Sequence, residues 1–171
     1  MIYLSIGSNL NSRFGNRFDN INKSIQLLKN KKLKIVKISK FYETPSYPNK
    51  NLPKFINIAI SINFSEKPSD LLKITSDIEK KMDRVLTPNN EPRTLDIDII
   101  DFKKIILKTK LLELPHPKAQ ERNFVLMPLY EINPNWKHPI NNIKIKDLIN
   151  KLATNKRNEI TRLKEGAILE S

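Results

Sequence analysis

The chain has 171 residues, of which 39% are hydrophobic and 29% charged, and this balance is typical of one globular domain of ordinary size. It has no cysteine and only two histidines, which excludes disulfides and thiolate chemistry and argues against an all-imidazole zinc site. The first residues alternate like a strand and do not resemble a leader, and no apolar run approaches the roughly 18 residues of a membrane span. We therefore expect a cytoplasmic protein without a membrane partner, in which any metal ion has oxygen ligands.

The formal net charge of +13 raises the question of a nucleic-acid partner. The lysines are spread over most segments, and the chain is rich in Lys, Asn and Ile together. This pattern favours the compositional bias of an AT-rich genome over nucleic-acid binding, and we expect no nucleic-acid partner. A basic surface still favours small anionic substrates such as a nucleotide.

Hydrophobic periodicity predicts the elements: alternation indicates strands, and spacings of three and four residues indicate helices. Proline-rich segments without periodicity are predicted loops. In chain order, the expected elements are a strand at 2–7, a helix at 16–29, a strand at 33–42 with a bulge at Ile35–Val36, a loop at 43–54, a strand at 55–64, a helix from Pro68 to Val85, a loop at 86–92, an acidic strand, a hairpin around Lys103–Lys104 into 105–107, a short helix near Leu129 and a last helix at 145–152.

The order βαββαβ at the start of this series predicts an α+β fold. It describes a ferredoxin-like sandwich, in which an antiparallel sheet carries its helices on one face. An additional C-terminal hairpin and helices would follow. Residues 1–171 are expected to form a single domain, whose polar last part, residues 155–171, is predicted to be a poorly ordered tail.

The acidic strand lies in the stretch Glu91–Ile100, which reads EPRTLDIDII. Because side chains alternate along a strand, Asp96 and Asp98 share one face, with their α-carbons about 6.6 Å apart. Two like charges at that spacing predict a compensating cation. A half-exposed strand with an acidic outer face is the alternative reading.

Three predicted strands have one aliphatic face and one face of small or polar residues. An antiparallel sheet wetted on one side would show the same pattern. A solvated face, however, does not need a carboxylate pair together with an amide and aromatic rings, and this combination favours a binding surface. The residues concerned are Ser5, Gly7, Asn57, Ala59, Asp96 and Asp98 on the strands, with the aromatic residues Phe55 and Phe124.

Phosphate recognition by a glycine-rich loop is excluded, because the three glycines form neither GxxxxGK[ST] nor GxGxxG. Asp96 and Asp98 could instead bind one or two magnesium ions whose other ligands are phosphate oxygens. Candidate donors to phosphoryl charge are Arg84, Arg93, His116 and Arg122, although the sequence favours a surface or structural role for each of them taken singly.

Several segments in combination resemble the 6-hydroxymethyl-7,8-dihydropterin pyrophosphokinase family of folate biosynthesis, over Ile2 to about Pro139. The resemblance implies a ferredoxin-like fold, two magnesium ions, and transfer of the pyrophosphoryl group of ATP to the pterin hydroxymethyl oxygen with release of AMP. The matching segments are SIGSNL (Ser5–Leu10), FYETP (Phe41–Pro45), FIN (Phe55–Asn57), Ile78 and Glu79 with Arg84, PRTLDIDI (Pro92–Ile99) and PHPKAQERNFVLMPL (Pro115–Leu129).

The resemblance also implies roles for individual residues. Asp96 and Asp98 would hold both magnesium ions, and Phe55 and Phe124 would sandwich the pterin ring. The general base is open between Asp98 and a metal-bound hydroxyl. The other implied contacts are Thr44, Pro45 and Asn57 with the pterin, and Glu79, Arg84, Arg93, Ile99, His116 and Arg122 with ATP, of which Arg93 and Arg122, with Asp98, would be catalytic. Tyr47, which lies in a segment that departs from the family pattern, is expected to line the pterin pocket.

Two segments depart from the family pattern. The family usually has a further arginine and a tryptophan followed by glycine before PRTLD, and this chain has Leu86, Asn90 and Glu91 there. The glycine usual after Pro45 is also missing, in a segment that reads Ser46, Tyr47, Pro48. The loss of a cation and an aromatic ring is expected to weaken loop closure or product release unless another cation substitutes. The candidates are Lys50, Lys54 and Lys110.

Two other function classes are consistent with parts of the sequence. Ferredoxin-like sheets can bind RNA on an open face, but this needs exposed aromatic residues on central strands, and only Tyr3 and Phe55 qualify. A metal-dependent nucleotidyltransferase is the second alternative, because it could use the same Asp-x-Asp pair. The enzyme is expected to act on small molecules as a monomer.

Overall fold

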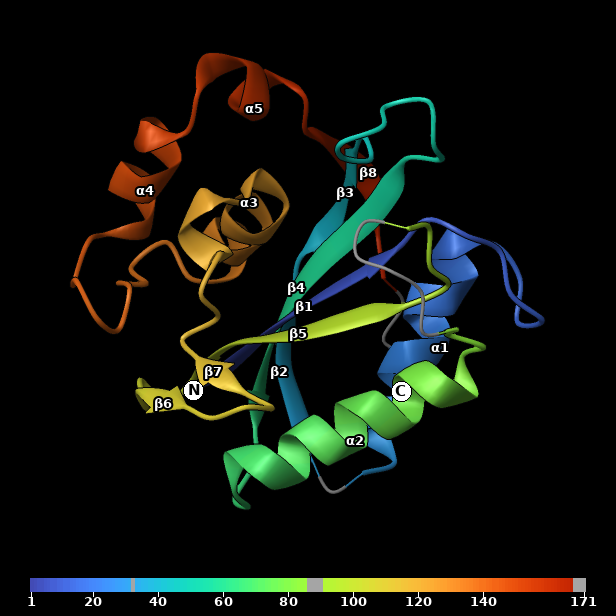
Figure 1. The fold of residues 1–171 in the computed structure, drawn as a ribbon, viewed down its shortest axis with the longest axis horizontal. Coiled ribbons are helices and arrows are strands. Elements are labelled where there is room, and N and C mark those ends of the chain that lie inside the picture. Colours follow the sequence, from blue (N-terminus) through green and yellow to red (C-terminus); the bar gives the residue numbers. More distant parts are fainter. Residues whose placement is uncertain (32, 86–90, 168–171) are drawn as a thin grey trace.

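The computed structural model describes residues 1–31, 33–85 and 91–167, and its central feature is an antiparallel sheet. The strands follow the order β5-β1-β4-β3-β8, and β2 pairs with β4 beside β3 (Figure 1). Their bounds are β1 Ile2–Ser8, β2 Lys34–Ile38, β3 Lys40–Thr44, β4 Phe55–Asn63, β5 Asp96–Phe102 and β8 Thr161–Gly166.

Two helices cover one face of this sheet, α1 (Arg17–Lys29) and α2 (Pro68–Lys81). Helix α1 begins as predicted, because the Asn16 side chain accepts hydrogen bonds from the amides of Phe18 and Asp19 at the first turn. Helix α2 ends at Lys81, earlier than predicted. The predicted extension to Val85 is wrong, since Asp83 has a positive φ of 63° that interrupts the helix and Val85 is exposed.

The other face of the sheet is also partly covered, by the additional C-terminal helices, whose position the sequence did not predict. Helices α3 (Asn123–Ile132) and α4 (Ile145–Lys151) pack over it, and the 3₁₀ helix η1 (Ala119–Glu121) precedes α3 (Figure 1). They build a second apolar core, because this face of the strands carries apolar residues over part of its area. These are Tyr3, Ala59 and Ile100.

The predicted strand at 33–42 is confirmed as two strands, β2 and β3, that both pair with β4. The strands separate at Ser39, whose amide donates to the Ala59 carbonyl at 2.9 Å and whose hydroxyl accepts from the Ala59 amide at 3.0 Å. The predicted bulge is confirmed by a register shift between Ile35 and Lys37.

The predicted hairpin after β5 is right about its turn and wrong about its partner. Lys103 and Lys104 have positive φ angles of 52° and 61°, as a tight turn requires. The chain then leaves the sheet, and β6 (Leu107–Lys108) pairs with β7 (Glu113–Leu114) in a separate two-stranded hairpin.

In the part of the predicted tail that the structure describes, residues 155–167, the chain has regular structure instead of the expected poor order. It forms helix α5 (Thr154–Asn158) and strand β8, which pairs with β3 and extends the sheet. No element of the tail showed a clear hydrophobic period, because β8 lies at a sheet edge with mostly exposed side chains.

Among the helices of the described residues, none combines the length and the apolarity that a bilayer crossing requires.

Substitution of Trp136 by Phe is expected to destabilise the fold by about 3 kcal/mol. The indole Nε1 donates to Asp101 Oδ2 at 2.8 Å, and Asp101 is only 1% exposed, so the variant would leave a buried carboxylate oxygen unpaired. Chemical denaturation measures this loss. Tyr130→Phe, which changes an exposed aromatic residue of α3, is the control, and equal stability of the two variants would contradict the expectation.

Candidate active site

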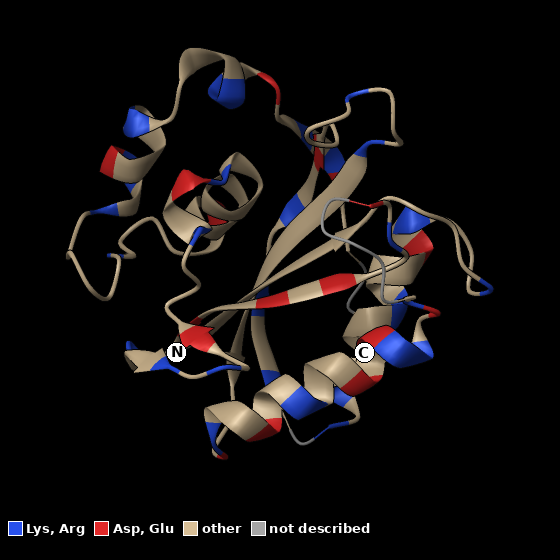
Figure 2. Cartoon of the chain, viewed as in Figure 1, with Lys and Arg blue, Asp and Glu red and all other residues tan. Residues whose placement is uncertain are grey.

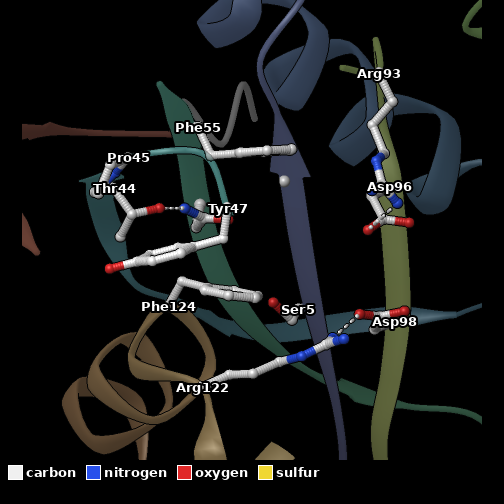
Figure 3. Close-up of a pocket in the computed structure, with 12 residues that line it drawn as sticks. Ser5, Thr44, Pro45, Tyr47, Phe55, Arg93, Asp96, Asp98, Arg122 and Phe124 are labelled. Carbon is white, nitrogen blue, oxygen red and sulfur yellow. Dashed lines mark hydrogen bonds and ion pairs between the residues drawn. The ribbon is translucent and has the colours of Figure 1, made fainter. Parts of the chain in front are cut away.

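A pocket of about 210 Å³ opens on the part of the second sheet face that α3 leaves uncovered (Figure 3). Residues from β1, β3, β4 and β5, the loop after β3, and the start of α3 meet there. The lining residues are Ser5, Gly7, Thr44, Pro45, Tyr47, Phe55, Asn57, Arg93, Asp96, Asp98, Arg122 and Phe124.

The register of strands β4, β1 and β5 brings the predicted small and polar residues into two rows. Gly7 on β1 pairs with Asn57 on β4 and with Asp96 on β5, which gives the first row. Ser5 pairs in the same way with Ala59 and Asp98. Because Gly7 and Ser5 are small, the middle of this face is hollow, whereas the larger Tyr3 at the other end of β1 belongs to the core under α3.

Gly7 permits a close approach between the strands at the base of the pocket. A Cβ atom on Gly7 would lie 2.9 Å from Asn57 Oδ1, closer than packed atoms tolerate. Asn57 is 3% exposed, and its amide nitrogen donates to Thr44 Oγ1 at 3.0 Å, so it has little freedom to move away. The absence of a side chain at Gly7 therefore allows the Asn57 side-chain amide to occupy its position at the base of the pocket.

If the pocket binds a pterin, as the resemblance implies, substitution of Gly7 by Ala is expected to weaken that binding by about tenfold, because it displaces the Asn57 amide from the edge of the pocket. Isothermal titration with a hydroxymethyl pterin measures the effect. Gly166→Ala is the matched control, since the nearest neighbour of its Cβ would be the Cδ atom of the flexible Lys40 side chain at 3.0 Å, and the Lys40 Cα lies at an ordinary contact distance of 3.8 Å. An unchanged dissociation constant for Gly7→Ala would contradict this reading.

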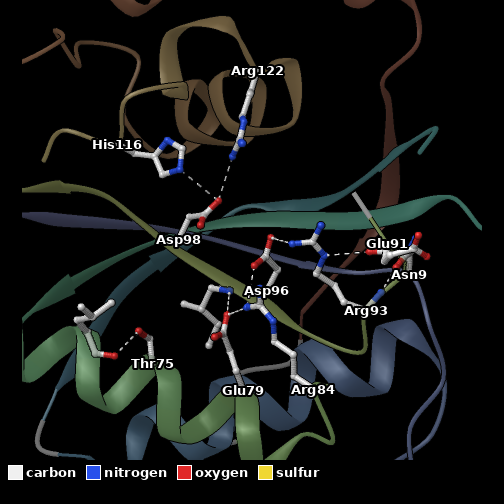
Figure 4. Close-up of polar contacts among 12 residues, drawn as sticks. Asn9, Thr75, Glu79, Arg84, Glu91, Arg93, Asp96, Asp98, His116 and Arg122 are labelled. Carbon is white, nitrogen blue, oxygen red and sulfur yellow. Dashed lines mark hydrogen bonds and ion pairs between the residues drawn. The ribbon is translucent and has the colours of Figure 1, made fainter. Parts of the chain in front are cut away.

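The two carboxylates of β5 are paired with arginine side chains (Figure 4). Asp96 lies 2.9 Å from Arg84 Nη1 and 3.1 Å from Arg93 Nη1, and Asp98 lies 3.2 Å from Arg122 Nη1. Guanidinium groups therefore supply the compensating charge that the spacing of the aspartates predicts.

Asp98 has the chemistry of a carboxylate held ready for a cation. Burial, together with repulsion from Asp96, raises the pKa of Asp98 to about 6, and Arg122 opposes this shift. Asp98 is therefore ionised near pH 7 at a cost that an additional cation would relieve. In Figure 2 the acidic residues of β5 form red bands along this edge strand, while Lys and Arg are spread over helices, loops and other strands.

The donor set fits magnesium bound together with a nucleotide. Within the described ranges, no cluster of three or more His, Cys, Asp or Glu side chains could enclose a metal ion. Magnesium bound to phosphates needs only one or two carboxylates, because phosphate oxygens and water complete its octahedron. Asp96 and Asp98 both line the pocket and are about one quarter exposed, which leaves their oxygens accessible.

Glu79 and Arg84 lie behind the carboxylate pair and outside the pocket lining. Glu79 Oε1 accepts from the Ile97 amide at 2.7 Å and contacts Arg84 Nη1, which also reaches Asp96. Burial raises the pKa of Glu79 to about 7, against the opposing charge of Arg84. In this structure Glu79 orders β5 and Arg84 and does not face the cavity.

His116 approaches Asp98 from the segment before η1. Burial and the nearby Arg122 lower the pKa of His116 to about 4, so the ring is neutral near pH 7. Its Nδ1 accepts from the Lys118 amide at 3.2 Å, which leaves the proton on Nε2, 3.7 Å from Asp98 Oδ2. Neutral His116 can therefore donate one hydrogen bond toward the carboxylate end of the pocket.

The opposite end of the pocket is aromatic. Phe55 begins β4 and Phe124 lies in the first turn of α3, and Figure 3 shows both side chains and that of Tyr47 among the residues that line the pocket. Thr44 and Pro45 complete this end. The pocket thus joins a flat apolar chamber to a charged end.

The structure brings together most of the predicted site residues but not all of them. Ile99 is an exception: its side chain belongs to the core under α1 and α2, so only its main chain could meet a nucleotide. The three lysines expected to replace the missing cation do not line the pocket. Lys54 pairs with Glu43 at 3.2 Å, and Lys50 pairs with Glu159 at 2.5 Å. Lys110 lies between β6 and β7. Leu86 and Asn90 lie outside the described residues.

Two residues near the site were missed from the sequence. Asn9 is 3% exposed and joins two loops, because its Nδ2 donates to the Pro53 carbonyl at 3.0 Å and its Oδ1 accepts from the Arg93 amide at 2.7 Å. Its position in the SIGSNL segment was a usable signal. Glu159, which contacts Tyr47, lies in the unpatterned C-terminal segment and gave none.

Comparison with known proteins gives one family. The model of the 7,8-dihydro-6-hydroxymethylpterin-pyrophosphokinase family matches residues 3–134. A 2-amino-4-hydroxy-6-hydroxymethyldihydropteridine pyrophosphokinase of Aquifex aeolicus is 38% identical over 139 residues, covering 81% of this chain and 84% of its own.

Longer relatives match over only part of their length. The folic acid synthesis protein FOL1 of Dictyostelium discoideum is 43% identical over 139 residues, which are 81% of this chain and 20% of that protein. The chain spans about a fifth of the length of the first curated relatives it matches.

Solved structures agree on the fold. Wild-type HPPK-DHPS of Plasmodium falciparum superposes with a TM-score of 0.70 at 17% identity, covering 94% of this chain and 44% of that one. At that identity the likeness supports the arrangement of sheet and helices and carries no argument about the reaction.

Proposed function

Because the chain belongs to the 7,8-dihydro-6-hydroxymethylpterin-pyrophosphokinase family, we propose that it transfers the pyrophosphoryl group of ATP to the hydroxymethyl oxygen of 6-hydroxymethyl-7,8-dihydropterin. The products are AMP and the pterin pyrophosphate, in the synthesis of folate. One observation carries this assignment to the site: a single pocket has an aromatic chamber at one end and a carboxylate pair with converging arginines at the other.

The aromatic end is proposed to bind the pterin. Phe55 and Phe124 would stack on its two faces, and the Asn57 amide, held by Thr44, would recognise its edge. Main-chain groups of Thr44 and Pro45 and the ring of Tyr47 would complete the wall. This placement directs the hydroxymethyl group toward β1 and β5.

The charged end is proposed to bind ATP, with magnesium held by Asp96 and Asp98. Two magnesium ions, as the resemblance implies, would neutralise phosphate charge when bound with the nucleotide. Two arginines that pair with the aspartates in this structure, Arg93 and Arg122, would reorient to bind phosphate oxygens. His116 would donate a hydrogen bond to a phosphate oxygen from its Nε2. Glu79 and Arg84 would act from behind by holding Asp96 in place.

The transfer is an in-line displacement at the β-phosphorus. The hydroxymethyl oxygen forms a bond to that phosphorus, the bond from it to the α,β-bridging oxygen breaks, and AMP leaves with the electron pair. Asp98 is the proposed acceptor of the hydroxyl proton. The contribution of the remaining residues is positioning and charge stabilisation, as in other phosphoryl transfers.

The remaining features of the proposal concern the whole chain. The antiparallel order β5-β1-β4 followed by β2 and β3 supports a ferredoxin-like frame for a single pyrophosphokinase domain. The protein is proposed to act in the cytoplasm, as a monomer, on small molecules and without nucleic acid.

Measurement of AMP formation tests the function. The chain is incubated with ATP and magnesium, with and without the hydroxymethyl dihydropterin, and AMP is quantified by chromatography. Pterin-dependent AMP formation supports the proposal. ATP hydrolysis that does not depend on the pterin, or transfer of a nucleotidyl group with release of pyrophosphate, would contradict it.

A further inference from the structure

The C-terminal segment reaches the pocket from outside the region that matches the family model. The match ends at residue 134, and α5 and β8 lie beyond it. Helix α5 contacts the start of α3, and the chain then runs to β8 beside β3 (Figure 1). The segment therefore passes the two elements that carry the walls of the aromatic chamber.

The segment is firmly attached to the body of the protein. Thr161 pairs with Glu43 and Arg162 with Tyr42 in the ladder between β8 and β3. The Arg162 guanidinium also donates to both oxygens of Glu131 on α3, at 3.0 and 3.2 Å. These contacts anchor β8, and they therefore restrict the position of the residues just before it, including Glu159.

One contact joins this segment to the Phe124 wall. Asn123 Nδ2, at the start of α3, donates to the Lys156 carbonyl of α5 at 2.5 Å. Phe124 is the next residue, and its ring forms one side of the chamber. Helix α5 is therefore attached directly beside the aromatic residue proposed to stack on the pterin.

A second contact joins the segment to the Tyr47 wall. The Tyr47 hydroxyl donates to Glu159 Oε2, and Lys50 Nζ lies 2.5 Å from Glu159 Oε1. Lys50 also lies 5.5 Å from the centroid of the Tyr47 ring. The Glu159 side chain is 19% exposed, whereas that of Lys50 is 55% exposed, so the carboxylate is the covered member of this cluster.

We propose that Glu159 is a positioning residue that holds Tyr47 in place as a wall of the pterin chamber. The inference rests on the proposed function, because it assigns the pterin to this end of the pocket. Tyr47 is 41% exposed on a loop rich in proline, so without a fixed partner its ring would sample other rotamers. Fixing the ring before the ligand arrives lowers the entropy lost on binding.

A positioning role for Glu159 and a purely structural role predict different effects of its loss on fold stability and on pterin binding. An exposed ion pair such as that of Lys50 with Glu159 stabilises a fold very little. Loss of Glu159 is therefore expected to change ligand binding more than the melting temperature. The effect should also be confined to the pterin, because Glu159 is absent from the charged end of the pocket.

The test is a double-mutant cycle of Glu159→Gln and Tyr47→Phe in the full chain. Pterin binding is titrated in the presence of magnesium and a nonhydrolysable ATP analogue, and the KM for pterin and kcat are measured. Each single variant is expected to bind pterin about fivefold more weakly, and the double variant no more weakly than the weaker single variant. The affinity for the ATP analogue and the melting temperature should stay within about twofold and about 2 °C of wild type.

Glu165→Gln, which neutralises an exposed carboxylate on β8, is the matched control and should bind pterin like wild type. Unchanged or tighter pterin binding by Glu159→Gln, additive losses in the double variant, or equal losses for pterin and the ATP analogue would overturn the inference. Failure of the wild-type chain to bind pterin would instead overturn the proposed function.

Discussion

Asp98→Asn is expected to lower pterin-dependent AMP formation at least about a thousandfold, and Asp96→Asn should have a comparable effect. Asparagine keeps the size of each side chain but removes the negative charge that would hold magnesium beside the nucleotide phosphates. The two carboxylates share one face of β5 and both line the pocket, so neither has a described neighbour that could replace it there.

The fold of both variants is expected to stay intact. Asp98 is ionised against burial and against repulsion from Asp96, so a neutral amide removes an unfavourable charge as well as the ion pair with Arg122. Cooperative thermal unfolding checks this, and Asp147→Asn on the exposed face of α4 is the matched control for activity. Near-normal turnover by either site variant, or loss of a cooperative transition, would contradict the assignment.

Phe124→Ala is expected to weaken pterin binding by about 10- to 100-fold while the affinity for an ATP analogue changes by less than about twofold. The ring lines the aromatic end of the pocket, and its removal takes away one stacking face and opens the chamber to water. Arg93 and Arg122, the proposed phosphate donors, remain in the variant, so the proposed nucleotide site keeps its charges.

Phe124→Tyr is the matched variant, because it preserves a ring that can stack at the same position. It should retain pterin binding within about threefold of wild type, whereas Phe124→Ala should not. Separate titrations with pterin and with the ATP analogue distinguish the two ligands. Equal losses for both ligands in Phe124→Ala would show that the ring supports the whole pocket and does not sandwich the pterin.

The strands around the site could be predicted because their alternation is regular. In β4, and in β5 as far as Ile99, every second residue is aliphatic and packs under α1 and α2, so the remaining positions had to share the other face. This placed Asn57, Asp96 and Asp98 together correctly. The same alternation puts the Ile99 side chain in the core, which explains why its assignment to ATP by resemblance gains no side-chain support.

The coverage of the second face could not be predicted in the same way. Ala59 and Ile100 are compatible with a solvent-exposed face of the sheet and with a covered one. The proline-rich sequence after Leu114 showed no clear amphipathic period that would predict α3. The position of α3 determines where Phe124 and Arg122 meet the strands. The site was thus predictable as a set of residues, and its division into a covered half and an open half was not.

The C-terminal contacts had no sequence signal at all. Strand β8 is short, polar and at an edge, where exposed side chains remove the alternation that reveals a strand. The pairing of Arg162 with Glu131 and of Glu159 with Tyr47 joins residues that are far apart in the sequence. Such pairs follow from tertiary structure and not from local pattern.

The most direct test of the account is a crystal structure of the chain with magnesium, a nonhydrolysable ATP analogue and a hydroxymethyl pterin. We predict metal density in contact with carboxylate oxygens of Asp96 and Asp98 and the pterin ring between Phe55 and Phe124, with its hydroxymethyl oxygen facing the β-phosphate. A structure in which both ligands are bound but these carboxylates still pair only with Arg93 and Arg122, or in which the pterin lies outside the aromatic chamber, would contradict it.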